Sequence, residues 1–291
     1  MSLISSFIED VGFVAEAADH ITISPFKQAL IAGNAFLAIL RRDLLVTWRD
    51  IRGFFAQVLL QPFFFLFIFG KVLSSIGVVQ QNFGALLLPG IVALTVITSA
   101  LQSVTLPLVL DLGFAREIDD RLQAPLPVSL VAVEKVLFAA MRGLLAGSVI
   151  FPMAFVILGQ GYQMRTDALG MLVGMMVLTA LAGASLGMMI GTFVRPEKVG
   201  LMFSLIFTPL IFTGCTYYPW AALTAIPWFQ IITLFNPLTY AAEGLRAAMV
   251  PPVHGHMLPT LGIGWILLGL GLSIIVFLAL GIQMFRRRII V

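Results

Sequence analysis

Six long apolar segments constrain the fold of this chain more than any other feature of its sequence. Each is long enough to cross a hydrocarbon core of roughly 30 Å, which takes about 17 to 25 residues of helix. The segments cover residues 54–72, 86–110, 136–158, 168–193, 199–216 and 261–285. Only 11% of the residues are charged, whereas about a quarter are charged in a typical soluble domain. The sequence therefore predicts an all-α polytopic membrane protein with six transmembrane helices.

The lysine and arginine residues indicate how these helices are oriented. An even number of spans places both termini on one side of the membrane, and 13 of the 17 basic residues then share that side, because Lys71, Arg165 and Arg246 fall opposite and Arg142 lies within a span. The 13 are Lys27, Arg41, Arg42, Arg49, Arg52, Arg116, Arg121, Lys135, Arg195, Lys198, Arg286, Arg287 and Arg288. Since cytoplasmic flanks of spans are enriched in Lys and Arg, we predict that both termini are cytoplasmic.

A polar segment, residues 111–135, separates the second and third apolar segments. Its charged residues are Asp111, Arg116, Glu117, Asp119, Asp120, Arg121, Glu134 and Lys135. So many charges would carry a large desolvation cost in hydrocarbon. We therefore expect a cytoplasmic loop that a water-soluble partner can contact.

The residues before the first apolar segment are too polar to span a membrane. Residues 1–25 carry acidic side chains but no Lys or Arg and predict an acidic tail or a short helix. Residues 26–52 place apolar side chains at helical spacing with basic residues elsewhere, which predicts an amphipathic helix at the cytoplasmic interface. The six-helix transmembrane domain then occupies residues 53–291.

Residues 217–260, before the last span, are too apolar for a solvated loop and too rich in proline for a further span. We predict short interfacial or re-entrant helices on the outer side, one of them over about Pro237–Met249. Glu243 and Arg246 are three residues apart on this helix. Their side chains could pair, which would lower the cost of placing two charges at the membrane edge.

Two motifs make the chain resemble a known family, and the first lies in the polar loop. Arg116 and Glu117 are followed by Leu122, by Ala124-Pro125 and by Lys135 ahead of the third span. This order is similar to the cytoplasmic loop of the permease subunits of ABC type-2 transporters. Asp119 and Asp120 stand where that loop often has a Gly-Thr pair.

The second motif is the more specific and lies in the outer region. The sequence LFNPLTYAAEGLR, at Leu234–Arg246, resembles the Asn-Pro-Leu-Thr-Tyr signature before the last span of these permeases. A Gly-x-x-x-x-Pro element at Gly214–Pro219 precedes it. The resemblance is closest to the daunorubicin-resistance-type and nodulation-factor export permeases, and it covers about residues 26–291.

The resemblance implies a permease subunit of an ATP-binding-cassette exporter in the bacterial cytoplasmic membrane. Such a subunit would move a drug, lipid or glycolipid outward with two copies of a separate ATPase subunit and a second or related permease. ATP and Mg would be held by that partner, because this chain has no Gly-x-x-x-x-Gly-Lys-Ser/Thr loop for phosphate. Export of a lipid-linked oligosaccharide or polysaccharide is an alternative, and a non-transporting membrane scaffold or sensor is another.

The residues themselves argue against intramembrane catalysis and against a proton-coupled carrier, since the predicted spans contain no Asp, Glu or His. We therefore predict no catalytic residue, no metal site and no nucleic-acid partner. Arg142 is the one charge within the third span, and it either snorkels to the inner headgroups or holds an anionic substrate headgroup.

The candidate site residues fall into three groups. Residues expected to couple to the ATPase are Arg41, Arg42, Arg116, Glu117, Asp119, Asp120, Arg121 and Lys135. Residues of an expected outer gate are Asn236, Pro237, Tyr240, Glu243 and Arg246. Polar residues that line a substrate path or serve as helix packing contacts are Gln57, Gln61, Gln102, Thr105 and Thr208.

Overall fold

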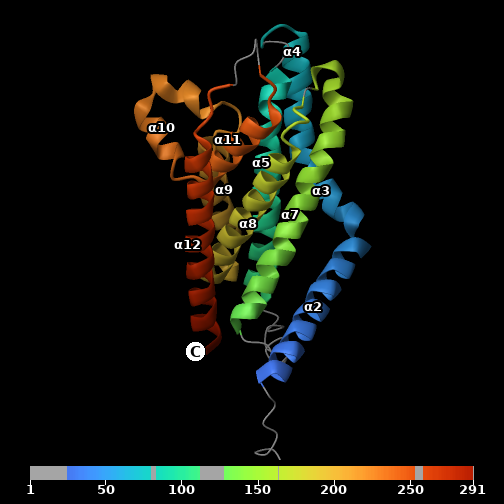
Figure 1. The fold of residues 1–291 in the computed structure, drawn as a ribbon, viewed down its shortest axis with the longest axis vertical. Coiled ribbons are helices and arrows are strands. Elements are labelled where there is room, and N and C mark those ends of the chain that lie inside the picture. The colour runs from blue at the N-terminus through green and yellow to red at the C-terminus, as the bar shows by residue number, and fades with distance from the viewer. Residues whose placement is uncertain (1–24, 80–82, 112–127, 163, 253–257, 291) are drawn as a thin grey trace, which may run out of the picture.

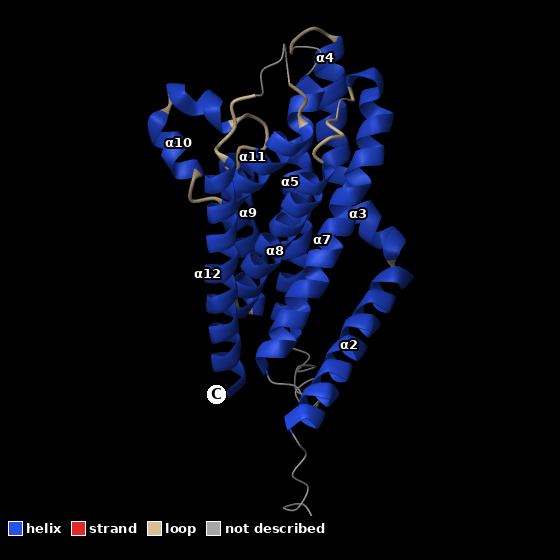
Figure 2. Ribbon diagram, in the orientation of Figure 1, coloured by secondary structure: helices blue, strands red, loops and turns tan. Residues whose placement is uncertain are grey.

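The computed structural model describes residues 25–79, 83–111, 128–162, 164–252 and 258–290. Within these ranges the chain is helical and contains no β-strand (Figure 2). The elements are α2 (Pro25–Arg49), α3 (Ile51–Phe65), the π-helical η1 (Leu66–Val72), α4 (Leu73–Ser75), α5 (Phe83–Leu110), α7 (Val128–Leu158), η3 (Gly159–Gly161), α8 (Leu169–Phe193), η4 (Pro196–Lys198), α9 (Val199–Thr213), η5 (Trp220–Ala225), α10 (Pro227–Thr233), α11 (Pro237–Met249) and α12 (Ile263–Ile290).

Among the described residues, six helical segments are long and apolar enough to cross a membrane. They cover Ile51–Ser75, Phe83–Leu110, Ser129–Leu158, Leu169–Phe193, Pro196–Thr213 and Ile263–Arg288. The predicted all-α fold with six transmembrane helices is therefore confirmed. The first segment is continuous through α3, η1 and α4, because the proline inside it, Pro62, is followed by further helical turns.

The third span begins earlier than the charge pattern predicts. The sequence predicts a loop as far as Lys135, but α7 starts at Val128, and this part of the loop prediction is wrong. Glu134 and Lys135 are both buried. Lys135 Nζ lies 3.1 Å from Asp111 Oδ2 at the end of α5. Burying a paired cation costs much less free energy than burying a lone one. The helix can therefore include a segment whose charges alone predict a solvated loop.

The core of the bundle is α5, which packs against α7, α8 and α11. On α8, Gly183 and Gly187 face the backbone of α5, and a Cβ at either position would lie 2.5 Å from the carbonyl oxygen of Ile97 or Leu101. Without side chains at these positions the two backbones approach closely, as is common between membrane helices. On its other side α8 packs against α12.

The helices define two ends of the bundle. α2 begins and α12 ends at the same end (Figure 1), as an even number of spans requires, and we call this the terminal end. α10 and α11 lie toward the opposite end (Figure 1), which we call the α11 end. α2 runs obliquely beside α7 in its approach to α3. Its place at a membrane interface stays a prediction.

Candidate functional site

The candidate site at the α11 end begins at the N-terminus of α11, where Asn236 caps the helix and Pro237 is its first residue. Asn236 Oδ1 accepts a hydrogen bond from Leu238 N at 2.9 Å. Its amide Nδ2 donates to Leu210 O and to Thr213 Oγ1, each at 2.8 Å. The side chain thus caps α11 and also attaches it to the last turn of α9. This dual role explains why a polar residue is buried here.

An ion pair lies at the centre of α11, buried from solvent. Arg246 Nη1 donates to Glu243 Oε1, and the side chains are 1% and 0% exposed. The pairing predicted from their spacing is therefore present.

The backbone around the pair supplies further hydrogen bonds to both charges. Glu243 accepts from Trp220 N at 2.9 Å and from Leu261 N at 3.1 Å. Arg246 Nη2 donates to Cys215 O at 3.0 Å. One ion pair therefore joins α11 to three other segments: the turn after α9, the start of η5 and the approach to α12. We call the five residues in these bonds the ion-pair cluster: Glu243, Arg246, Cys215, Trp220 and Leu261.

Tyr240, also predicted in the outer gate, has a separate role on α11. Its hydroxyl donates to Leu234 O at 2.8 Å. Its ring lies against Gly269 of α12, where a Cβ would be 2.6 Å from the ring carbons. Tyr240 therefore fixes the packing of α11 on α12, and among the described residues its hydroxyl forms no hydrogen bond with the ion-pair cluster.

A second ion pair at the α11 end has no counterpart among the predicted sites. Arg165 Nε lies 2.8 Å from Asp167 Oδ1 and Arg165 Nη2 lies 2.8 Å from Oδ2. Hydrogen bonds from Arg165 lower the pKa of the Asp167 carboxyl. Arg165 N also donates to Met249 O at the end of α11. The connection between α7 and α8 is thereby attached to α11.

At the terminal end, the structure places the described coupling candidates on two elements. Arg41 and Arg42 are exposed on α2, and Arg42 Nε lies 3.2 Å from Asp43 Oδ1. Lys135 is buried on α7 and paired with Asp111. The remaining candidates, Arg116, Glu117, Asp119, Asp120 and Arg121, lie outside the described residues.

Three of the predicted path residues lie together in a groove between α3 and α5. Gln57, Gln61 and Gln102 line a small cavity of about 50 Å³. A second cavity, of about 160 Å³, shares Gln57 and Gln102 and adds Ser103 and Arg142. The structure thus joins polar residues of two spans into one groove, which α7 borders at Arg142.

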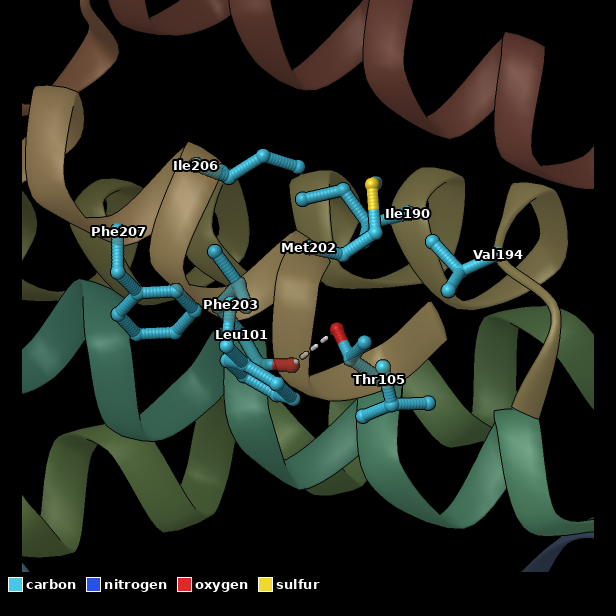
Figure 3. A pocket seen from close by; sticks show the side chains of 9 residues that line it. Leu101, Thr105, Ile190, Val194, Met202, Phe203, Ile206 and Phe207 are labelled. Carbon is cyan, nitrogen blue, oxygen red and sulfur yellow. Dashed lines mark hydrogen bonds between the residues drawn. The ribbon is translucent and has the colours of Figure 1, made fainter. Parts of the chain in front are cut away.

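The two threonines predicted for the path lie elsewhere. Thr105 is buried between α5 and α8, where its hydroxyl donates to Leu101 O at 2.8 Å and to Gly187 O at 3.1 Å. Figure 3 shows Thr105 in a crevice that is otherwise lined by apolar side chains and has an internal volume of only about 10 Å³. Thr208 is exposed on α9. The alternative role as a packing contact fits Thr105.

A comparison with known protein families identifies the chain. The sequence profile of the family described as ABC-2 type transporter matches residues 34–250. This chain belongs to the ABC-2 type transporter family. The matched range runs from α2 to the residue after α11, so it includes the ion-pair cluster up to Arg246 and the groove between α3 and α5. The family resemblance predicted from the two motifs is confirmed.

Individual relatives of this ABC-2 protein are also permeases by name. The transport permease ycf38 of Pyropia yezoensis is 27% identical over 254 residues, which cover 84% of each chain. Its counterpart in Porphyra purpurea is 26% identical over 219 residues, or 72% of each chain. The inner membrane transport permease YadH of Escherichia coli K12 is 28% identical over 186 residues, or 62% of this chain and 70% of YadH. The protein is therefore a multi-pass membrane permease of an ABC transporter, a transport subunit and not itself an enzyme.

Proposed function

We propose that this ABC-2 permease exports a hydrophobic or amphiphilic molecule across the bacterial cytoplasmic membrane. The observation that carries the proposal is the family match over residues 34–250, because the family implies a partner ATP-binding subunit. ATP and Mg would be bound by that partner. The permease would supply the path and convert movements of the partner into transport.

In this proposal the terminal end faces the cytoplasm and contacts the ATP-binding subunits. It carries Arg41 and Arg42 on α2, and the polar loop with Arg116 and Glu117 starts there, directly after α5. Exposed arginines on a helix offer bonding groups to carboxylates of a soluble partner. Two permease copies with two ATP-binding subunits would form the complete transporter, and the substrate would move along the seam between the permeases.

We infer that α11 closes the path at the outer end. The ion-pair cluster joins α11 to segments on either side of it, so displacing the helix would break several hydrogen bonds at once. Such a closure is stable while the pair is intact, and it opens when substrate or a neighbouring helix supplies replacement contacts.

The proposed partnership is tested by purifying the permease with its ATP-binding subunit. We expect the two to copurify and to hydrolyse ATP. Replacing Arg116 and Glu117 together with Ala should weaken assembly or uncouple hydrolysis from export, and leave the amount of permease in the membrane unchanged. Wild-type assembly and export in this variant would show that the two residues do not couple. A permease that copurifies with no ATP-binding subunit would favour the scaffold alternative.

The proposed orientation is tested with one added cysteine in each of two variants, located at the two ends of α8. Thr166 and Glu197 are both exposed, Thr166 at the α11 end and Glu197 at the terminal end. In intact cells an impermeant maleimide should label Thr166→Cys, and it should label Glu197→Cys only after the membrane is opened. Native Cys215 should stay unlabelled, because it is buried and burial raises the pKa of its thiol to about 11. Labelling of Glu197→Cys in sealed cells would contradict the proposed orientation and place the terminal end outside the cell.

A further inference from the structure

A further cavity adjoins the groove between α3 and α5 on the side of the terminal end, beside the last turns of α2. It has a volume of about 470 Å³, within the range of small-molecule sites, and is bounded by α2, α5 and α7. Ser103, Pro107 and Arg142 line both this cavity and the upper one of about 160 Å³. The two spaces are therefore neighbours that meet at Arg142.

The charges around the larger cavity are paired, with one exception. Lys135 is paired with Asp111, and Arg42 with Asp43. Arg142 has no ion-pair partner among the described residues, and its Nε is buried without a hydrogen bond there. Asp50, at the junction of α2 and α3, acts on Arg142 electrostatically but forms no ion pair with it. With three cations and two carboxylates in its lining, the cavity has a net charge of 3 − 2 = +1.

The guanidinium of Arg142 is held in place by aromatic side chains. Its Cζ lies 4.6 Å from the centre of the Phe54 ring and 5.9 Å from that of Phe138. These contacts stabilise a cation without neutralising it, so the hydrogen-bonding capacity of the guanidinium remains for a ligand. A snorkelling arginine places its charge in water among headgroups, whereas this one lies between two cavities of the protein.

The surroundings of Arg142 are amphiphilic. Gln57, Gln102 and Ser103 present polar groups beside it, and Phe54, Val58 and Leu106 present apolar ones. A guanidinium binds carboxylate or phosphate oxygens through two parallel hydrogen bonds. The apolar side chains can contact the rest of the same molecule.

We propose that Arg142 binds the acidic group, a phosphate or a carboxylate, of an amphiphile that enters the permease from the terminal end. The proposal rests on the proposed export function and narrows its substrate class to anionic amphiphiles. Phe54 and Phe138 act as positioning residues for the guanidinium. The neighbouring polar side chains complete the hydrogen bonding of the acidic group.

The test uses purified full-length permease and two fluorescent lipids with identical short chains, a phosphatidic acid and a phosphatidylcholine. Wild-type protein should bind the phosphatidic acid at least about tenfold more tightly, as expected for a charge-assisted pair. Arg142→Gln should remove this preference, and Arg142→Lys should retain part of it. Arg195→Gln, which removes an exposed arginine at the same end of the bundle, should leave it unchanged. All variants are compared as monodisperse protein.

Two further measurements make the test specific. The first distinguishes an amphiphile from a free anion as the ligand, and the second distinguishes failure of the binding proposal from failure of the export proposal. Millimolar inorganic phosphate should compete poorly if the apolar part of the ligand is required, and full competition would make this a site for free anions. Equal binding of the two lipids by wild type, or an unchanged preference in Arg142→Gln, would overturn the inference even if the complex exports other molecules. If the preference for phosphatidic acid depends on Arg142 but the complex shows no ATP-driven export, the binding site is supported and the export function is refuted.

Discussion

Replacing Glu243 alone with Gln should destabilise the folded permease more than replacing Glu243 and Arg246 together. In Glu243→Gln the Arg246 cation stays buried without its counter-charge, and the neutral carbonyl oxygen of Cys215 does not replace that charge. Removing one member of a buried pair typically costs about 3 to 5 kcal/mol, whereas neutralising both costs less. Arg246→Gln should be the milder single change, because the carboxylate of Glu243 keeps hydrogen bonds from Trp220 N and Leu261 N.

The measurement is a double-mutant cycle on thermal unfolding in detergent, repeated on export at matched expression. Arg165→Gln and Asp167→Asn provide the matched control, since that pair lies at the same end but Asp167 is 66% exposed. Exposed pairs contribute about 0 to 1 kcal/mol, so the control cycle should show little coupling. Strictly additive losses for Glu243 and Arg246 would show that the pair does not act as a unit. That result would contradict the proposal that the pair holds α11 closed.

Replacing Gly90 with Ala should severely impair folding of the permease. Gly90 lies on α5 against the turn after α9, and a Cβ there would be 1.9 Å from the carbonyl oxygen of Thr216. Backbone atoms cannot move aside as a flexible side chain can, so we expect a cost at or above the roughly 1 to 3 kcal/mol typical of overpacking. The shift would also displace Cys215, which accepts a hydrogen bond from Arg246.

Gly170→Ala on α8 is the control for this change, because a Cβ there meets no atom within 4 Å. It should be neutral or stabilising, since Ala favours helix over Gly by up to about 1 kcal/mol. Both variants are compared by the yield of monodisperse protein and by the unfolding midpoint. If Gly90→Ala matches Gly170→Ala, then α5 and the turn after α9 are not in the close contact described.

The parts of this fold that follow local rules could be predicted from the sequence. Long apolar segments have one stable solution in lipid, which is a spanning helix. Asn236 and Pro237 mark the start of α11 by capping preferences that involve only neighbouring residues. The spacing of Glu243 and Arg246 places both side chains on one helix face.

The rest depends on contacts between distant segments. The cluster bonds Glu243 and Arg246 to backbone groups of Cys215, Trp220 and Leu261, and backbone groups leave no signal in residue identity. The start of α7 could not be predicted from the sequence for the same reason. Lys135 alone predicts a solvated loop, and only its ion pair with Asp111 explains why it is buried on a helix.

The path candidates show the same limit. Residue type alone does not distinguish a polar side chain in a groove from one that hydrogen-bonds a helix backbone. Gln57, Gln61 and Gln102 share cavity walls, whereas Thr105 bonds to Gly187 O of the neighbouring helix. Only the packing of α3, α5 and α8 separates these cases.

The most direct test of the central claim is ATP-driven movement of an amphiphile through the assembled complex. Inside-out vesicles would contain the permease with its ATP-binding subunit, and daunorubicin or the fluorescent phosphatidic acid would be added outside with ATP and Mg. The account predicts accumulation in the lumen that requires ATP and both subunits, with the phosphatidic acid favoured. Vesicles that hydrolyse ATP but accumulate neither probe above the level without ATP would contradict it.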